Sequence, residues 1–331
     1  MAGNIYNMSD MTYPEFNALD RDRTLILQGV SPVEVHGTHM PLKTDYFTVE
    51  SLLKRAAKSI RTRLPGWDAV ISPTLPVGSD TLPLPGSIEI RPRILKGLMT
   101  DYGCSLARHG FRHIALLSAH GGPRHDAALE LACRAVMRRH RDVQMFTPTG
   151  DVILYVMLGD ITEDLKERLR GIVAPEIIDT LLPSDVHAGA LETSLGLLFM
   201  PELIKKDYGK LPDNTFGTSN RLVNRAVRSF FNQLARLVLV FPSYRKDPEK
   251  TRLFYYFMGE MINMFVLPDG PVPVHAGFPR KSSKVLGRAY ADLIVERAVD
   301  MIHDVITGKR DIESTFTLFS RSALIRAGVR L

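Results

Sequence analysis

The sequence has few cysteines and no long hydrophobic run. Cys104 and Cys133 are the two cysteines among 331 residues, and both fall in amphipathic helical patterns, which indicates small core residues and argues against a disulfide framework. The N-terminus has no basic region followed by an apolar stretch, so we expect no signal peptide. The most apolar window, residues 230–241, contains two amides and an arginine and is too short to span a bilayer. We therefore expect a cytoplasmic protein that does not enter a membrane.

The sequence also lacks a strongly basic segment. Its 42 Lys and Arg residues exceed its 36 Asp and Glu residues by a net charge of +6, and no RNA-binding motif accompanies them. The short basic stretch at residues 138–141 is typical of a solvated helix end. We therefore expect no nucleic-acid partner, whereas the modest positive balance suits a small-molecule substrate that carries negative charge.

The composition and the order of segments predict an α/β fold. Hydrophobic residues make up 45% of the chain and charged residues 24%, as in a globular protein with a sizeable core. Strand-like and helix-like segments alternate through the first half, which predicts a mostly parallel sheet covered by helices on both faces. The expected strands are residues 24–30, 68–73, 113–118 and 143–146, and the clearest expected helices are residues 92–109, about 126–139 and about 283–306.

The second half is less regular. Residues 153–182 look helical, and residues 221–267 carry Arg, Phe, Tyr and Met at helical spacing, a stripe that more often forms core or subunit interface than a binding site. The sequence contains no internal repeat, low-complexity segment or dividing linker. We therefore expect a single domain over residues 1–331 with a helix-rich insertion at about 205–270.

Histidine and carboxylate residues crowd into the segment that follows the first expected strand. Glu34 and His36 alternate on an extended stretch and share a face, and the turn at Gly37 allows Asp45 to return to the same place. Single residues of these types usually lie on the surface, but the presence of His39 as a fourth favours a site. Two carboxylates and an imidazole at the end of a strand suit a divalent metal.

Two later segments add further candidates. His120 directly follows the strand at 113–118, and the two glycines after it let backbone approach a ligand closely. His187 opens another expected helix, on which Glu192 lies among leucines. An unpaired carboxylate would be costly to bury there. A metal or other cationic partner explains Glu192, and so does simple exposure.

Three motifs therefore follow one another along the chain, and they resemble the creatininase (creatinine amidohydrolase) family. Supporting matches are the segments 85–87 and 277–279, and the resemblance covers most of residues 10–200 and about 275–307. The motifs are Glu34-x-His36-Gly37-x-His39-x-Pro41-Leu42-x-Thr44-Asp45, His120-Gly121-Gly122 and His187-Ala188-Gly189-x-x-Glu192-Thr193-Ser194.

The resemblance implies a three-layer αβα fold with a two-metal hydrolase site, commonly assembled into a homo-oligomer. Transferred residue by residue, it implies that Glu34 and His120 hold one metal, that His36 holds the other and that Asp45 bridges both. Mixed nitrogen and oxygen ligands without a thiolate suit Zn, Mn or Fe. Two such ions lower the pKa of a shared bridging water, and the resulting hydroxide would attack a carbonyl.

The chain also departs from the family pattern. The creatinine-cleaving members have a metal-binding Glu two residues beyond the His that matches His120, and here that position is Gly122. The next position, Asn in one branch of the family, is Pro123. These departures argue against creatinine itself as the substrate. Our hypothesis is that Glu192 fills the vacant ligand position.

Two histidines are expected to act beside the metals. His187, with a near-neutral pKa, would protonate the leaving nitrogen, and His39 either orients the ligands or forms part of the substrate wall. The expected activity is metal-dependent hydrolysis of a C–N bond in a cyclic amide, a formamide or a peptide-like substrate. Two alternatives stay open: metal-dependent ring opening of a cyclic polyol ketone or lactone, and a non-catalytic homologue that binds a ligand or a subunit.

Overall fold

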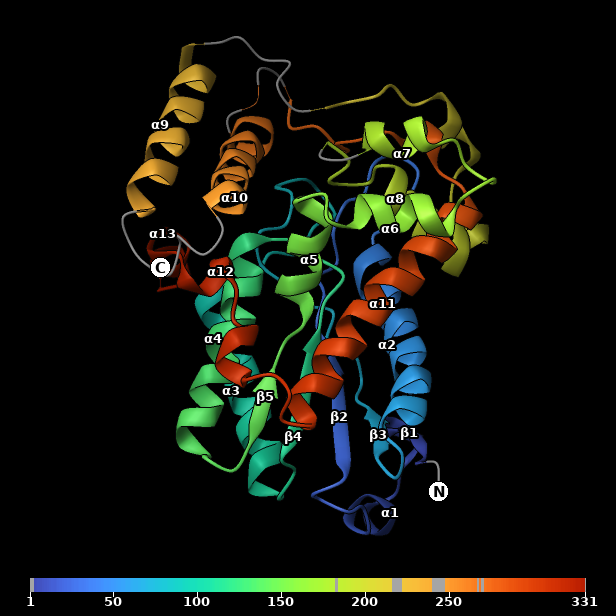
Figure 1. The fold of residues 1–331 in the computed structure, drawn as a ribbon, viewed down its shortest axis with the longest axis vertical. Coiled ribbons are helices and arrows are strands. Elements are labelled where there is room, and N and C mark those ends of the chain that lie inside the picture. The colour runs from blue at the N-terminus through green and yellow to red at the C-terminus, as the bar shows by residue number, and fades with distance from the viewer. Residues whose placement is uncertain are drawn as a thin grey trace.

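A five-stranded sheet with parallel neighbours forms the centre of the molecule (Figure 1). The computed structural model describes residues 3–181, 184–215, 222–239, 248–266, 268 and 271–330. The mostly parallel sheet expected from the sequence is confirmed, with one short edge strand, β1, that the sequence analysis missed. The strands are β1 (Ile5–Asn7), β2 (Thr24–Gly29), β3 (Asp68–Ile71), β4 (His113–Leu117) and β5 (Gln144–Phe146), in the order β1-β3-β2-β4-β5.

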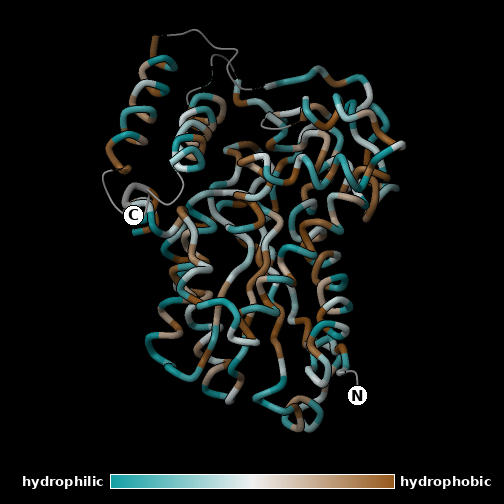
Figure 2. The backbone as a smooth tube through the Cα atoms, in the orientation of Figure 1, coloured by the Kyte–Doolittle hydropathy of each residue, from teal (hydrophilic) through white to brown (hydrophobic). Residues whose placement is uncertain are grey.

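Helices cover both faces of the sheet, which confirms the three-layer αβα architecture. Successive side chains of a strand point to opposite faces, so Leu25 and Leu27 belong to one hydrophobic core and Ile26 to the other. All residues of β2 are buried, and Figure 2 shows the strands as a largely hydrophobic centre. The first core contains α2 (Thr44–Arg63), α8 (Ala190–Phe199) and α11 (Lys284–Ile306), and the second contains α3 (Pro92–Arg108) and α4 (Pro123–Arg139).

The ends of these helices follow local sequence signals. Both α3 and α4 begin with proline, which suits the first turn because the N–H that proline lacks has no partner there. For this reason α4 begins at Pro123, earlier than the expected start at Asp126. Gly110 follows α3 with a φ of +89°, the left-handed conformation of a C-terminal glycine. Ser283 caps α11 by accepting a hydrogen bond from the N–H of Leu286.

The stretch expected to be helical at residues 153–182 consists of separate helices. Gly159 and Gly171 interrupt it with φ values of +78° and +76°, which a continuous right-handed helix does not allow. Residues 182 and 183 lie outside the described residues. The helices of this stretch are α5 (Thr149–Met157), α6 (Ile161–Arg168) and α7 (Pro175–Leu181).

The expected helical insertion contains α9 (Leu222–Val238) and α10 (Pro248–Met261), followed by a π-helix at Ile262–Val266. Figure 1 shows α9 and α10 side by side beyond the carboxyl ends of the strands. Phe254 of α10 packs against Phe319, with ring centroids 5.5 Å apart, and so joins the insertion to the C-terminal helices α12 (Leu318–Arg321) and α13 (Ala323–Arg330). Residues 216–221, 240–247, 267, 269 and 270 of the expected insertion lie outside the described residues.

Several smaller expectations can be compared with the structure. Cys104 and Cys133 are free and buried, as predicted for core residues. None of the helices in the described ranges combines the length and the apolar character needed to cross a membrane. A short helix, α1 (Tyr13–Asn17), precedes β2 and was not expected.

The carboxyl ends of β2 and β4 form the place where a ligand is expected to bind. The two strands are neighbours, but α2 follows β2 on one face and α4 follows β4 on the other. Because the two connections diverge, a crevice opens between them at this edge of the sheet. Glu34 and His36 leave the end of β2, and His120 leaves the end of β4, so the topology alone brings the first two motifs together.

Candidate metal centre

Asp45 lies between two histidines that follow different strands. Its Oδ1 is 3.0 Å from His36 Nε2, and its Oδ2 is 3.3 Å from His120 Nδ1. Glu34 Oε2 lies 3.0 Å from the same His120 nitrogen. All these side chains are buried. The structure therefore brings the ligands expected from the first two motifs together, with Asp45 common to both halves of the cluster.

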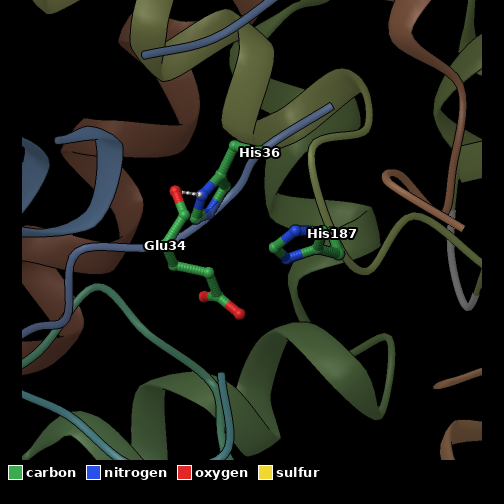
Figure 3. Close-up of side chains that lie close together, drawn as sticks. All are labelled: Glu34, His36 and His187. Carbon is green, nitrogen blue, oxygen red and sulfur yellow. Dashed lines mark hydrogen bonds between the residues drawn. The ribbon is translucent and has the colours of Figure 1, made fainter. Parts of the chain in front are cut away.

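Backbone carbonyls determine which ring nitrogen carries the proton. His36 Nδ1 is 3.2 Å from the Glu34 carbonyl oxygen (Figure 3), and His120 Nε2 is 2.8 Å from the Ser79 carbonyl oxygen. Because a carbonyl only accepts, these nitrogens donate, and the other nitrogen of each neutral ring presents a lone pair. Each lone pair faces carboxylate oxygens, and this arrangement is favourable only with positive charge between them.

The donor atoms fit divalent cations. Glu34 Oε2 and Asp45 Oδ2 are buried and accept no hydrogen bond from the described residues, which is unusual for buried carboxylate oxygens. Oxygen and imidazole donors without a thiolate are suitable ligands for Zn, Mn or Fe. The described residues form two sets whose ligand atoms lie within 4.8 Å of one another and that share Asp45: Glu34, Asp45 and His120, and His36, Asp45 and Glu192.

Glu192 reaches the cluster from α8. Its Oε2 is 3.6 Å from His36 Nε2 and accepts a hydrogen bond of 2.6 Å from the N–H of Ala188. Ala188 has a φ of +47°, a strained value for a residue with a Cβ, and such strain is common beside functional sites. Burial raises the pKa of Glu192 to about 7, although the charge of His36 opposes this shift. Of the two explanations left open by the sequence, the structure therefore favours a cationic partner over simple exposure.

The cluster has a strong preference for positive charge. Burial acts to lower the pKa of His36, but the charges of Asp45 and Glu192 raise it to about 10. Burial also opposes protonation of His120, yet Glu34 and Asp45 raise its pKa well above the ordinary value. Several carboxylates gathered in a buried place need compensating charge, which either protons on the rings or divalent cations can supply.

His187 faces the cluster from a separate segment of the chain (Figure 3). Its ring centroid is 4.3 Å from that of His36, its Nε2 donates to the Val35 carbonyl oxygen at 2.8 Å, and with Glu34 and His36 it forms a third possible ligand group. The near-neutral pKa expected for His187 from the sequence was wrong. Burial and the charge of His36 lower the pKa of His187 to about 4, so its Nδ1 is a proton acceptor at neutral pH.

Comparisons with known proteins agree with the family resemblance of the three sequence motifs. A family model described as creatinine amidohydrolase matches residues 9–302. This chain belongs to the creatininase family. A creatinine amidohydrolase of Pseudomonas putida is 25% identical over 216 residues, which span 60% of this chain and 74% of that relative.

Solved structures of creatininases share the fold. A structure named as creatininase with Mn is 19% identical and has a TM-score of 0.58, with 91% of this chain and 98% of the other covered. A crystal structure of creatinine amidohydrolase is 20% identical and has a TM-score of 0.56, with 92% of this chain and 97% of the other covered. The likeness extends over nearly the whole chain and supports the creatininase-like three-layer architecture.

Local packing explains why this member of the creatininase family has glycine at position 122. A Cβ placed on Gly122 would lie 2.6 Å from His120 Nε2 and 2.8 Å from the Ser79 carbonyl oxygen. These two atoms form the hydrogen bond that orients the His120 ring. A glutamate at this position would therefore displace the loop that contains Ser79. Glu192 on α8 brings a further carboxylate close to His36.

His39 is not among the residues that line the cavity around the cluster. Its Nε2 is 2.8 Å from Thr193 Oγ1, so the ring connects the loop after β2 to the helix that carries Glu192. Gly37 approaches the same ring closely: with a φ of +63°, it lies where a Cβ would be 2.5 Å from His39 Nδ1. Of the two roles left open by the sequence, these contacts favour orientation of the ligands over contact with a substrate.

The burial of His39 predicts a pH-dependent contribution to stability. Burial lowers its pKa from 6.5 to about 4. On acidification, the ring is therefore protonated at a higher pH in the unfolded chain than in the folded protein. This contribution is present above pH 6.5 and is lost as the pH falls toward 4. In metal-free protein, the free energy of unfolding should fall between pH 7 and pH 4 by about 3 kcal/mol more in the wild type than in His39→Gln. Urea denaturation at both pH values measures this difference, and equal losses would contradict it.

Asp185 supports the centre, although the sequence analysis gave it no role. Its buried carboxylate accepts hydrogen bonds of 2.6 and 2.7 Å from the N–H groups of Ala190 and Leu191, at the start of α8. It also accepts one of 2.9 Å from the N–H of Phe278, in the segment that precedes α11. The carboxylate thus holds the start of α8 and the segment of His187 together. An acidic residue just before a helix is the signal that indicates such a role.

Proposed function

We propose that the protein is a metal-dependent hydrolase that uses a dinuclear site to cleave a carbon–nitrogen bond in an amide-type substrate. The observation that carries this proposal is that Asp45 is shared between two sets of nitrogen and oxygen ligand atoms. In the proposed assignment, Glu34, Asp45 and His120 hold one cation and His36, Asp45 and Glu192 hold the other. Membership of the creatininase family supports the same class of reaction.

The mechanism combines metal chemistry with the chain's own proton transfers. When bound, two divalent cations polarise a carbonyl group and lower the pKa of a water molecule. The carbonyl oxygens of Glu34 and Ser79 hold the His36 and His120 rings in the tautomer that presents a lone pair to the centre. His187, uncharged at neutral pH, accepts a proton at Nδ1 from the attacking water and delivers it to the leaving nitrogen.

Creatinine itself is not the proposed substrate, because Gly122 replaces the glutamate of the creatinine-cleaving members. A cyclic amide, a formamide or a peptide-like amide is proposed instead. Ring opening of a cyclic polyol ketone or lactone would use the same centre and is the alternative activity, and a non-catalytic homologue is the other alternative. The cytoplasmic location, the homo-oligomer and the single domain over residues 1–331 remain predictions.

Metal analysis and a substrate panel together test the proposal. The purified protein is expected to contain about two equivalents of Zn, Mn or Fe per chain, and to release amine or ammonia from members of an amide panel. Ring opening of ketones or lactones without release of amine would support the alternative activity. Less than one equivalent of metal, with no gain on adding Zn or Mn, would identify a non-catalytic homologue.

Glu192 offers a specific test of the second ligand set. We expect Glu192→Gln to retain about one equivalent of metal and to lower turnover about 10²-fold or more, because an amide is a weaker ligand than a carboxylate. The matched control is Glu202→Gln, just after α8, whose side chain is exposed and belongs to none of the candidate ligand groups. Two equivalents of metal with full activity in Glu192→Gln would show that another group completes the set.

A further inference from the structure

The candidate metal centre opens into a large cavity. Its volume is about 1190 Å³, whereas sites for small molecules usually measure about 300–1,000 Å³. Glu34, His120, His187 and Glu192 line one part of this cavity. A substrate consisting only of a small cyclic amide would therefore leave most of the volume unfilled.

One wall of the cavity comes from the helical insertion. The lining residues of α10 and the π-helix form two rows with a spacing of four residues, so they share one face of the helical segment. None of these side chains is charged, and the two methionines can adapt to irregular ligand shapes. The residues of this wall, which we call the apolar wall, are Phe257, Met258, Met261, Ile262, Phe265 and Val266.

The apolar wall begins directly beside the metal centre. The rings of Phe265 and His187 meet edge to face, with centroids 6.2 Å apart. On the other sides, α5 contributes Val152 and Val156, and α11 contributes Ile294. A ligand group that extends away from the cluster therefore passes between apolar side chains from separate helices.

The charged residues of the cavity outside the cluster are already paired. The Arg124 guanidinium contacts the carboxylate of Asp80, and Glu89 accepts hydrogen bonds of 2.9 Å from both the N–H and the hydroxyl of Thr81. They lie on the segment before α3 and at the start of α4. Asp185, which also lines the cavity, accepts hydrogen bonds from three backbone N–H groups. The cavity thus has a polar end at the cluster and an apolar remainder.

From this division we propose that the substrate is amphipathic: an amide or lactam that bears an extended apolar group, such as an alkyl chain. The carbonyl lies at the cluster, and the apolar group lies along the apolar wall. This inference rests on the proposed hydrolase function for the placement of the carbonyl. Burial of the ligand's apolar group depends only on the shape and chemistry of the cavity, because transfer of an apolar group from water to an apolar surface is favourable.

Binding of linear carboxamides of increasing length tests the inference without turnover. In calorimetric titrations of the metal-free protein, each added methylene between butanamide and decanamide should lower Kd about fourfold until the cavity is filled. Met258→Gln and Met261→Gln should each reduce this gain per methylene. The matched control is Met264→Gln, from the π-helix that follows α10. The Met264 side chain does not line the cavity, so this variant should retain the wild-type dependence.

The outcomes separate this inference from the proposed function. A Kd that does not change with chain length would overturn the inference, even if short amides are hydrolysed. An equal effect of all three methionine substitutions would also overturn the assignment of the wall. A Kd that improves with length, together with metal-loaded protein that hydrolyses none of the amides, would support the inference and count against the hydrolase. The chain-length series needs only the wild-type protein, so it stands even if a variant does not fold.

Discussion

The variant Asp45→Asn is expected to lose both metal ions and to reduce kcat/KM by about 10³-fold or more. Asp45 Oδ1 and Oδ2 lie 3.0 and 3.3 Å from the ring nitrogens of His36 and His120, so this one side chain belongs to both ligand sets. Asparagine removes the charge and turns an N–H₂ group toward a nitrogen lone pair. Elemental analysis and steady-state kinetics on the best substrate of the panel measure the two effects.

A matched control separates this effect from a general loss of stability. Asp292→Asn removes a partly exposed carboxylate on α11 that lies 2.6 Å from Arg55 Nη1. Exposed ion pairs contribute about 0–1 kcal/mol, so this variant should keep its metals and its activity. If Asp45→Asn binds two equivalents of metal and retains activity within tenfold of the wild type, Asp45 does not bridge two ions.

The second large effect is expected for His187→Ala, which should lower kcat about 10²- to 10⁴-fold while both metals stay bound. His187 Nε2 donates to the Val35 carbonyl oxygen at 2.8 Å, which leaves Nδ1 free to accept and return a proton. The ring lines the cavity, and its pKa of about 4 makes it uncharged at neutral pH. Alanine removes the proton carrier but none of the atoms assigned to the two ligand sets.

His113→Ala is a suitable control for His187→Ala. His113 begins β4, at the opposite end of the strand from His120, and its Nδ1 is 3.0 Å from Gln144 Oε1. Its replacement should leave kcat within a few-fold of the wild type. Loss of one metal equivalent from His187→Ala would instead make His187 a ligand, as the possible group with Glu34 and His36 allows.

Much of the fold could be predicted because local patterns of residues along the sequence indicate how many layers of helices and strands pack together. The apolar run of β2 indicates a strand with helices on both faces, and the glycine after α3 marks the end of that helix. The errors have equally local causes. β1 has three residues, too few to show a pattern, and Gly159 and Gly171 divide a stretch that looked helical throughout. In α4, Pro123 occupies the first turn, ahead of the expected start at Asp126.

The helical insertion shows why a periodic pattern identifies the apolar face of a helix but not what that face packs against. Arg, Phe, Tyr and Met at helical spacing in residues 221–267 favoured core or subunit interface. Phe254 is indeed core, in contact with Phe319, but Phe257 and Met261 on the same helix line the cavity beside the candidate metal centre. Which partner faces each row depends on how α10 is placed across the cavity from α5 and α11, and no local sequence pattern indicates that placement.

The types of ligand at the candidate centre, and the meeting of Glu34 and His36 with His120, followed from the residues alone, because parallel strands place their carboxyl ends at one edge of a sheet. The distances to Glu192, the low pKa of His187 and the reason for glycine at position 122 came only from the folded chain. Each of these depends on contacts between segments far apart in the sequence. Charge, burial and close packing act through space, so their consequences appear only once those segments lie side by side.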